Sequence, residues 1–244
     1  MPEPQDQHPQ SNHPVIWHPS PNFGDRPADC AIDMLVLHYT GMPNGDMALT
    51  RMCDPASQVS AHYMVEEDGC IYQLVAESKR AWHGGRGYWR GCTDVNSRSV
   101  GIEIVNPGHE FGYRPFAVAQ IDAVITLCQA ILRRHNIPAH NIIAHSDMAP
   151  DRKEDPGELF PWHQLAENGI GLWPRHLDAD ADDKEVDPET VFDSLLQQFG
   201  YGPGQKTENR IAFQRHWHPQ CLNGPANAHS IAILKNLIKQ CPAL

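Results

Sequence analysis

Two histidines stand at the ends of short apolar segments, and an aspartate follows the second histidine. His38 follows the apolar residues 34–37, His145 follows residues 141–144, and Asp155 lies ten residues after His145. Two imidazoles and one carboxylate form a ligand set of catalytic zinc, which keeps its fourth position for water. Taken alone, each histidine at a strand end is more often a structural residue than a ligand. The pattern therefore raises a metal site as a hypothesis.

Two further ionisable residues fit the same chemistry. Glu103 lies in the middle of the apolar segment 99–105, where a carboxylate is costly unless it is paired or functional. The alternative is a glutamate on the solvated side of an edge strand. Lys153 precedes Asp155 by two residues, so its ammonium could reach a developing oxyanion, but it also fits a surface lysine in the charged run DRKED.

Short strands must position these side chains. We predict strands at 34–37, 62–66, 71–75, 99–105 and 141–144, with Asp68-Gly69 closing a hairpin between the second and third. Strand alternation directs Val100, Ile102 and Ile104 to one face and Glu103 to the other. A short helix is expected at 48–53 and a long one at 115–136, which carries an apolar stripe at helical spacing. The expected fold class is α/β (α+β), a mixed central β-sheet flanked by helices.

The chain divides by composition into four parts. Residues 1–30 are rich in proline and histidine and predict an extended arm, and residues 31–177 hold the expected catalytic domain. The acidic stretch 178–189 predicts a solvated linker and carries seven acids against one lysine. Helical patterns at 188–199, 207–217 and 226–239 predict a small three-helix module over residues 190–244, either binding a ligand or packing as a cap.

Charge and cysteine usage narrow the class of protein. The 244 residues carry a formal net charge of −11, which disfavours a general nucleic-acid binder, and no apolar run is long enough for a membrane span. No secretory signal is visible at the start of the sequence. The seven cysteines are odd in number and include no CxxC, which favours a reducing compartment. We therefore expect a cytoplasmic protein, or a periplasmic or outer-membrane-associated one if a signal has been removed.

Five sequence blocks together resemble one enzyme family. LVLHYTGM, SAHYMVEEDG, RAWHGG, NSRSVGIEIVNPG and AHSDMAPDRKEDPGELFPW occur in order and resemble the zinc-dependent N-acetylmuramoyl-L-alanine amidases. This type-2 amidase fold is shared with phage T7-type lysozyme and the peptidoglycan recognition proteins. SPNFGDRP is similar to a segment of the bacterial anhydro-muropeptide amidases. The C-terminal AFQRHW and IAILKNLI resemble the peptidoglycan-binding module of the outer-membrane amidase.

The resemblance implies a role for each residue of the site. His38, His145 and Asp155 match the ligands of one Zn²⁺ per chain, Glu103 matches the general base, and Lys153 matches the residue that supports the transition state. The T7-type members carry a catalytic tyrosine at the position that corresponds to Ala61, so the resemblance leaves the proton transfers to Glu103.

Four residues are expected to contact substrate. Tyr39 follows the first ligand, and Trp82 and His83 could form a wall of the groove, because aromatic rings suit sugar faces. A core position for Trp82 is at least as consistent with its residue type. Asn96 matches a position near the substrate in the family.

The implied reaction is hydrolysis of the amide between the lactyl group of N-acetylmuramic acid, or its 1,6-anhydro form, and L-alanine. The alternatives are a non-catalytic peptidoglycan-binding protein of the same fold and a zinc peptidase. The expected partner is peptidoglycan or a muropeptide, with no nucleic acid, and the sequence predicts no oligomeric state. The completeness of the ligand set favours catalysis.

Overall fold

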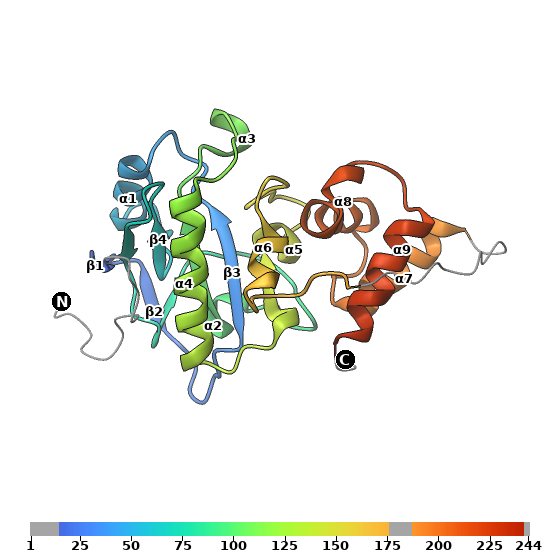
Figure 1. Cartoon of the computed structure of the whole chain (residues 1–244). Helices are drawn as coiled ribbons and strands as arrows, with labels where there is room; N and C mark the ends of the chain where they lie inside the picture. Colours follow the sequence, from blue (N-terminus) through green and yellow to red (C-terminus); the bar gives the residue numbers. More distant parts are fainter. Residues whose placement is uncertain (1–14, 176–186, 242–244) are drawn as a thin grey trace.

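A six-stranded mixed sheet lies at the centre of the computed structural model, which describes residues 15–175 and 187–241 (Figure 1). The strand order is β1-β5-β4-β7-β3-β8, and β2 and β6 pair separately. The strands are β1 (Val15–Trp17), β2 (Phe23–Asp25), β3 (Met34–Tyr39), β4 (Tyr63–Val65), β5 (Ile71–Gln73), β6 (Lys79–Ala81), β7 (Ser99–Ile104) and β8 (Ile142–Ala144). The central strands β4, β7, β3 and β8 run parallel to one another, whereas β4 and β5 form the antiparallel hairpin that the sequence predicts.

Helices cover both faces of the sheet. The N-terminal part of the chain contains α1 (Gly45–Cys53), α2 (Val95–Arg98), α3 (Gly108–Phe111), α4 (Val118–Arg134), η1 (Ala139–Asn141), α5 (His145–Met148) and α6 (Trp162–Glu167). The C-terminal helices are α7 (Pro188–Phe199), α8 (Lys206–Trp217), η2 (Pro219–Cys221) and α9 (Ala228–Lys239). The fold class expected from the sequence is confirmed, and α4 is slightly shorter than the predicted helix 115–136.

The face that packs on α4 is mainly apolar. Leu35 and Leu37 of β3 and Ile102 of β7 share one buried cluster with the apolar stripe of α4. Because side chains alternate along a strand, Val36 and His38 point to the opposite face, and so does Glu103. The alternation predicted for residues 99–105 therefore holds, and it places the candidate chemistry on the face away from α4.

The C-terminal helices complete the core on that opposite face. Met34 and Val36 of β3 belong to one buried cluster together with Phe192, Phe213 and Leu234 of α7, α8 and α9. In Figure 1 these helices gather at one end of the molecule, next to α5 and α6. The sequence left open whether these helices bind a ligand or pack as a cap. The structure shows that they pack against strand β3. The catalytic strands and the C-terminal helices share one hydrophobic core.

Two predicted boundaries need correction. The arm expected over residues 1–30 is wrong for its second half, because β1 joins the main sheet in parallel with β5, and β2 pairs with β6. A three-residue strand carries too little local signal, and its pairing partner lies more than fifty residues away. Residues 1–14 lie outside the described residues, as do residues 178–186 of the predicted linker. The last residues of that linker instead start a helix, since Asp187 caps α7 and Pro188 is its first residue.

One buried carboxylate should make stability depend on pH. Burial favours a raised pKa for Glu77, but hydrogen bonds from His135, Arg134 and the Tyr63 hydroxyl outweigh it and hold the pKa at about 2. The depressed folded-state pKa means that this stabilisation is present above the unfolded value and is lost as pH falls from about 4.5 toward 2. A shift of this size corresponds to about 3 kcal/mol at neutral pH.

We expect Glu77→Gln to lower the free energy of unfolding by roughly this amount at pH 7, about 3 kcal/mol by linkage, and by progressively less below pH 4. Urea titrations of both proteins across that range measure the difference. Glu67→Gln, at an exposed ion pair with Arg114, serves as the control and should change stability little. A Glu77→Gln deficit that stays constant with pH would contradict the assignment.

Candidate metal centre and active site

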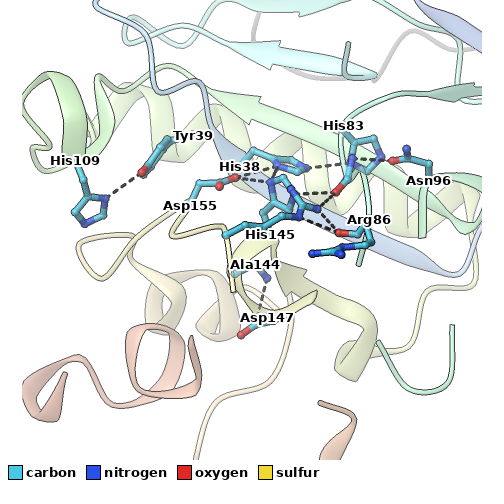
Figure 2. A network of polar contacts seen from close by, with 12 residues as sticks. His38, Tyr39, His83, Arg86, Asn96, His109, Ala144, His145, Asp147 and Asp155 are labelled. Atoms are coloured by element: carbon cyan, nitrogen blue, oxygen red, sulfur yellow. Dashed lines mark hydrogen bonds and ion pairs between the residues drawn. The ribbon is translucent and has the colours of Figure 1, made fainter. Parts of the chain in front are cut away.

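Three parallel strands bring the predicted site residues to one edge of the sheet. His38 lies directly beside Glu103 in the register of β3 with β7, and Leu37 lies beside Ala144 in the register of β3 with β8. His145 follows Ala144 as the first residue of α5, so it arrives next to His38. The carboxyl ends of parallel strands share one edge, and side chains there point into a common space. Figure 2 shows His38 and His145 converging from β3 and α5 with Asp155, which comes from the loop after α5.

The three candidate ligands meet through one atom each. The Nδ1 atoms of His38 and His145 are 2.8 Å apart, and Asp155 Oδ2 is 3.0 Å from the first and 2.9 Å from the second. All three residues are buried, and their ligand atoms form a group that could hold a metal ion. The sequence placed these residues together only through spacing and resemblance, and the fold brings them into contact.

The hydrogen bonds behind the two imidazoles fix where their protons lie. His145 Nε2 faces the carbonyl oxygen of Gly84 at 3.0 Å, so Nε2 carries the hydrogen and donates. The proton position on His38 follows from a chain of hydrogen bonds that begins at Ser99. Ser99 Oγ donates to Val95 O and therefore accepts from His83 Nε2. His83 Nδ1 is then an acceptor for the Nε2–H of His38, 3.0 Å away. In the neutral form of each ring, the remaining Nδ1 lone pair of His38 and of His145 faces Asp155.

This arrangement matches the donor set of a divalent cation. Burial, reinforced by the neighbouring His145, lowers the pKa of His38 to about 4, so its ring is neutral at pH 7. Burial alone would raise the pKa of Asp155, but the two imidazoles hold it well below its usual range. With both rings neutral, a carboxylate and two lone pairs would lie within hydrogen-bond distance of one another without a proton between them. A positive ion between them resolves this, and nitrogen and oxygen ligands of this kind suit zinc.

Glu103 lies beside this group and keeps one oxygen without a partner. Its Oε2 is buried and accepts no hydrogen bond from any described residue. Burial raises the pKa of Glu103 well above its usual value, the charge of Asp155 raises it further, and Lys153 opposes the shift. A buried carboxyl without a structural partner has a cost that function can explain. The alternative of a solvated edge-strand glutamate is excluded, because β7 lies between β4 and β3.

We call His38, His145 and Asp155 the metal group, because together they could hold a metal ion. A cavity of about 450 Å³ lies beside this group. Glu103, His145, Lys153 and Asp155 line it together with Tyr39, and its other walls come from α1, the loop at residues 59–60 and α3. The size is in the range of small-molecule sites. The cavity therefore places a candidate base, a candidate cation and the metal group around one space of small-molecule size.

The family model described as N-acetylmuramoyl-L-alanine amidase matches residues 28–158, which is more than half of the chain. The chain belongs to this family. The matched range contains every ligand, base and cation candidate named above, and it ends before the C-terminal helices begin. The family expected from the five sequence blocks is thereby confirmed.

Individual relatives extend the match beyond that range. The N-acetylmuramoyl-L-alanine amidase AmiD of Escherichia coli is 39% identical over 233 residues, which cover 86% of this chain and 83% of that protein. The 1,6-anhydro-N-acetylmuramyl-L-alanine amidase AmpD of Enterobacter cloacae is 33% identical, covering 60% of this chain and 86% of that protein.

Two solved complexes share the fold. E. coli AmiD bound to anhydro-N-acetylmuramic acid-L-Ala-D-γ-Glu-L-Lys gives a TM-score of 0.77 at 36% identity, covering 90% of this chain and 98% of that chain. AmpDh3 of Pseudomonas aeruginosa with anhydromuramic pentapeptide gives 0.77 at 30% identity, covering 87% and 93%.

The substrate-contact candidates of this family member divide into two groups. Tyr39 and Trp82 line the cavity, and the Tyr39 hydroxyl lies 3.0 Å from His109 Nδ1. Burial raises the pKa of Tyr39 to about 12, so it stays a neutral hydroxyl. His83 also borders the cavity, but both its ring nitrogens are engaged by His38 and Ser99. Its polar atoms therefore serve the metal group rather than a bound molecule.

Asn96 differs from the expectation, because the residues found to line the cavity do not include it. Its Oδ1 accepts from the backbone N–H of Gly84 at 2.7 Å, and the carbonyl of the same glycine accepts from His145 Nε2 (Figure 2). A buried side chain that fixes this loop acts behind the ligand. The sequence could not show this, because the contact depends on the path of the loop at 84–91.

Sequence reasoning missed two contributions to the site. Met42 and Arg51, from the turn before α1 and from α1 itself, line the cavity although neither belongs to a recognisable motif. The SPNFGDRP segment is similar to a segment of related amidases, but the sequence does not show what the segment does in the structure. Its Arg26 donates to the carbonyls of Glu77, Asn96, Ser97 and Ser99, and its Asn22 fixes the chain after α1. This segment therefore fixes the backbone at Asn96 and at Ser99, whose side chain contacts His83.

Proposed function

We propose that this chain hydrolyses the amide between the lactyl group of N-acetylmuramic acid, in its ordinary or 1,6-anhydro form, and L-alanine of the stem peptide. The observation that carries the proposal is the group of three convergent acceptors, His38 Nδ1, His145 Nδ1 and Asp155 Oδ2, beside an unpartnered Glu103. The relatives named AmiD and AmpD act on this amide by their names, and two solved relatives hold muropeptides.

The residues would divide the chemistry between them. His38, His145 and Asp155 would hold one Zn²⁺. When bound, zinc supplies a Lewis acid that acidifies water and polarises a carbonyl. Glu103 takes a proton from the attacking water and later returns a proton to the amine of the departing L-alanine. Lys153, which also lines the cavity, would place its ammonium against the negative charge that develops on the carbonyl oxygen.

Lys153 offers a test of the transition-state role. We expect Lys153→Ala to lower kcat by about 10²–10³, the usual loss for one oxyanion donor, while the metal content stays at the wild-type level. The same variant should leave KM nearly unchanged, because the interaction forms mainly in the transition state. Steady-state hydrolysis of an anhydro-muropeptide, with metal analysis of the same sample, measures both. Full activity of this variant would remove Lys153 from the site.

Metal content and substrate choice test the proposed function as a whole. The purified protein should contain one zinc per chain, lose hydrolysis of anhydro-N-acetylmuramyl peptide in a chelator, and regain it when zinc is returned. A plain peptide lacking the lactyl group should not be cleaved. Binding of the muropeptide without cleavage by the zinc-loaded protein would favour the recognition-protein alternative, and cleavage of the plain peptide would favour a peptidase.

We further propose that soluble anhydro-muropeptides are the preferred substrate and that the protein acts in a reducing, cytoplasmic compartment. All seven cysteines are free thiols, which suits such a compartment. No helix within residues 15–175 and 187–241 is long and apolar enough to cross a membrane. Digestion of intact sacculi and of soluble muropeptides in parallel tests the substrate, and fractionation of the native host tests the compartment. Preferential release of peptide from sacculi would instead support a peptidoglycan-binding role for residues 190–244 outside the cytoplasm.

A further inference from the structure

Asp147 is a buried carboxylate that the proposed chemistry does not use. It is completely shielded from solvent and lies two residues after His145, on the single turn of helix α5. Its Oδ2 accepts the backbone N–H of Ala144 at 2.8 Å, which closes the start of that helix (Figure 2). Asp147 therefore holds the short helix whose first residue is a candidate metal ligand.

The other hydrogen bonds to Asp147 come from the C-terminal part of the chain. The Tyr201 hydroxyl donates to Oδ1 at 2.6 Å, and His216 Nδ1 donates to Oδ2 at 2.7 Å. Tyr201 lies between α7 and α8, and His216 lies on α8. A carboxylate removed from water requires such donors, because an unpaired buried charge is strongly unfavourable. The C-terminal helices thus supply two of the three donors that keep this charge in place.

Both donors are themselves held rigidly. The His216 ring stacks between Trp162 and Trp217, with centroid distances of 3.7 and 3.5 Å. The Tyr201 ring packs edge-on against Trp89 at 5.2 Å. Their orientation is therefore set by aromatic packing and does not depend on Asp147. This arrangement has the form of an outer support that fixes the direction of a metal ligand.

We infer that Asp147 is a positioning residue for His145, and that Tyr201 and His216 make the C-terminal helices a structural part of the metal centre; this inference rests on the proposed zinc function. The path runs from the two aromatic-packed donors to the Asp147 carboxylate, then to the Ala144 N–H, and so to His145. Without the donors, the carboxylate must find other partners and the turn that carries His145 loses its anchor.

The test uses two variants, one that removes the two side-chain donors and one that replaces the accepting carboxylate. Tyr201→Phe and His216→Phe preserve the rings, and they are combined in one full-length protein. Asp147→Asn is made as a second, nearly isosteric change. Arg90→Ala is the matched control, because Arg90 also donates across the contact between the two parts, to the Phe199 carbonyl. The readouts are the dissociation constant for zinc by competition with a chelator, melting of the metal-free protein, and kcat and KM over a range of zinc concentrations.

We expect the double variant and Asp147→Asn to bind zinc about 10–100-fold more weakly, the range typical of supporting residues around a metal. Excess zinc should restore kcat with an unchanged KM. The metal-free double variant should melt below Arg90→Ala, because the buried Asp147 carboxylate has lost two donors, but it should still unfold in one cooperative transition. The control should keep the wild-type zinc affinity.

Two results would overturn the inference while leaving the proposed function intact. One is a wild-type zinc affinity in both variants. The other is an activity loss that zinc does not restore, together with loss of folding in both variants, which would assign Asp147 to stability alone. If the wild-type chain itself binds no zinc, the proposed function fails first and the inference fails with it.

Discussion

Replacing His38 with alanine should abolish both metal binding and amide hydrolysis. The variant leaves only His145 and Asp155 at the site, whereas a catalytic zinc is held by three protein ligands. Because bound zinc lowers the pKa of a water from 15.7 to about 7, we expect hydrolysis to fall by on the order of 10⁴ or more. Metal analysis of the dialysed protein and turnover of an anhydro-muropeptide measure the two losses.

The control for this variant is His163→Ala. His163 lies on α6 with 59% of its side chain exposed and is neither a candidate ligand nor a lining residue of the cavity, so its loss should leave metal content and turnover unchanged. Near-complete zinc binding by His38→Ala would show that the ligands lie elsewhere, and it would refute the metal centre described above.

Glu103→Gln should separate metal binding from proton transfer. The amide has almost the same shape as the carboxylate but cannot accept the proton, so we expect kcat to fall by about 10²–10⁴ while zinc is retained. The unpartnered buried oxygen predicts a second effect, in the opposite direction. Removing a poorly satisfied carboxyl should leave the metal-free protein at least as stable as wild type, because the site trades stability for function.

Kinetics and thermal melting of the same Glu103→Gln preparation test both effects. Glu167→Gln, at an exposed pair on α6, provides the control for removing one acidic side chain. Turnover at the wild-type rate would exclude Glu103 as the base. A large drop in melting temperature would show that the carboxylate has a structural partner after all.

The sequence was sufficient for the parts of this protein that local patterns encode. Parallel strands with alternating apolar residues place Leu37 and Ile102 in the core, and that alternation puts His38 and Glu103 together on the other face. The hairpin at Asp68-Gly69 and the long helix α4 follow from turn chemistry and from a helical stripe. The family could be predicted from the five sequence motifs, because they contain the residues of the candidate site.

What local patterns could not encode is pairing between distant segments. β1 has only three residues, and its pairing with β5 is what makes it a strand. The proton positions on His38 depend on a chain through His83 and Ser99, and Asn96 acts through a glycine backbone rather than on a substrate. The support of Asp147 by Tyr201 and His216 spans more than fifty residues. Each of these needs the tertiary fold before it can be seen.

The hydrophobic core shared by β3 and the C-terminal helices has a consequence for how the protein could be assembled. Met34, Val36 and Phe213 contribute to one cluster, so the association of the two parts is encoded in their buried surfaces. Two fragments, residues 1–180 and 181–244, should therefore recognise each other when they are co-expressed, whereas the first alone would expose apolar surface and aggregate. Fragment complementation of this kind would yield an amidase assembled from two separate chains, each of which contributes part of the shared hydrophobic core.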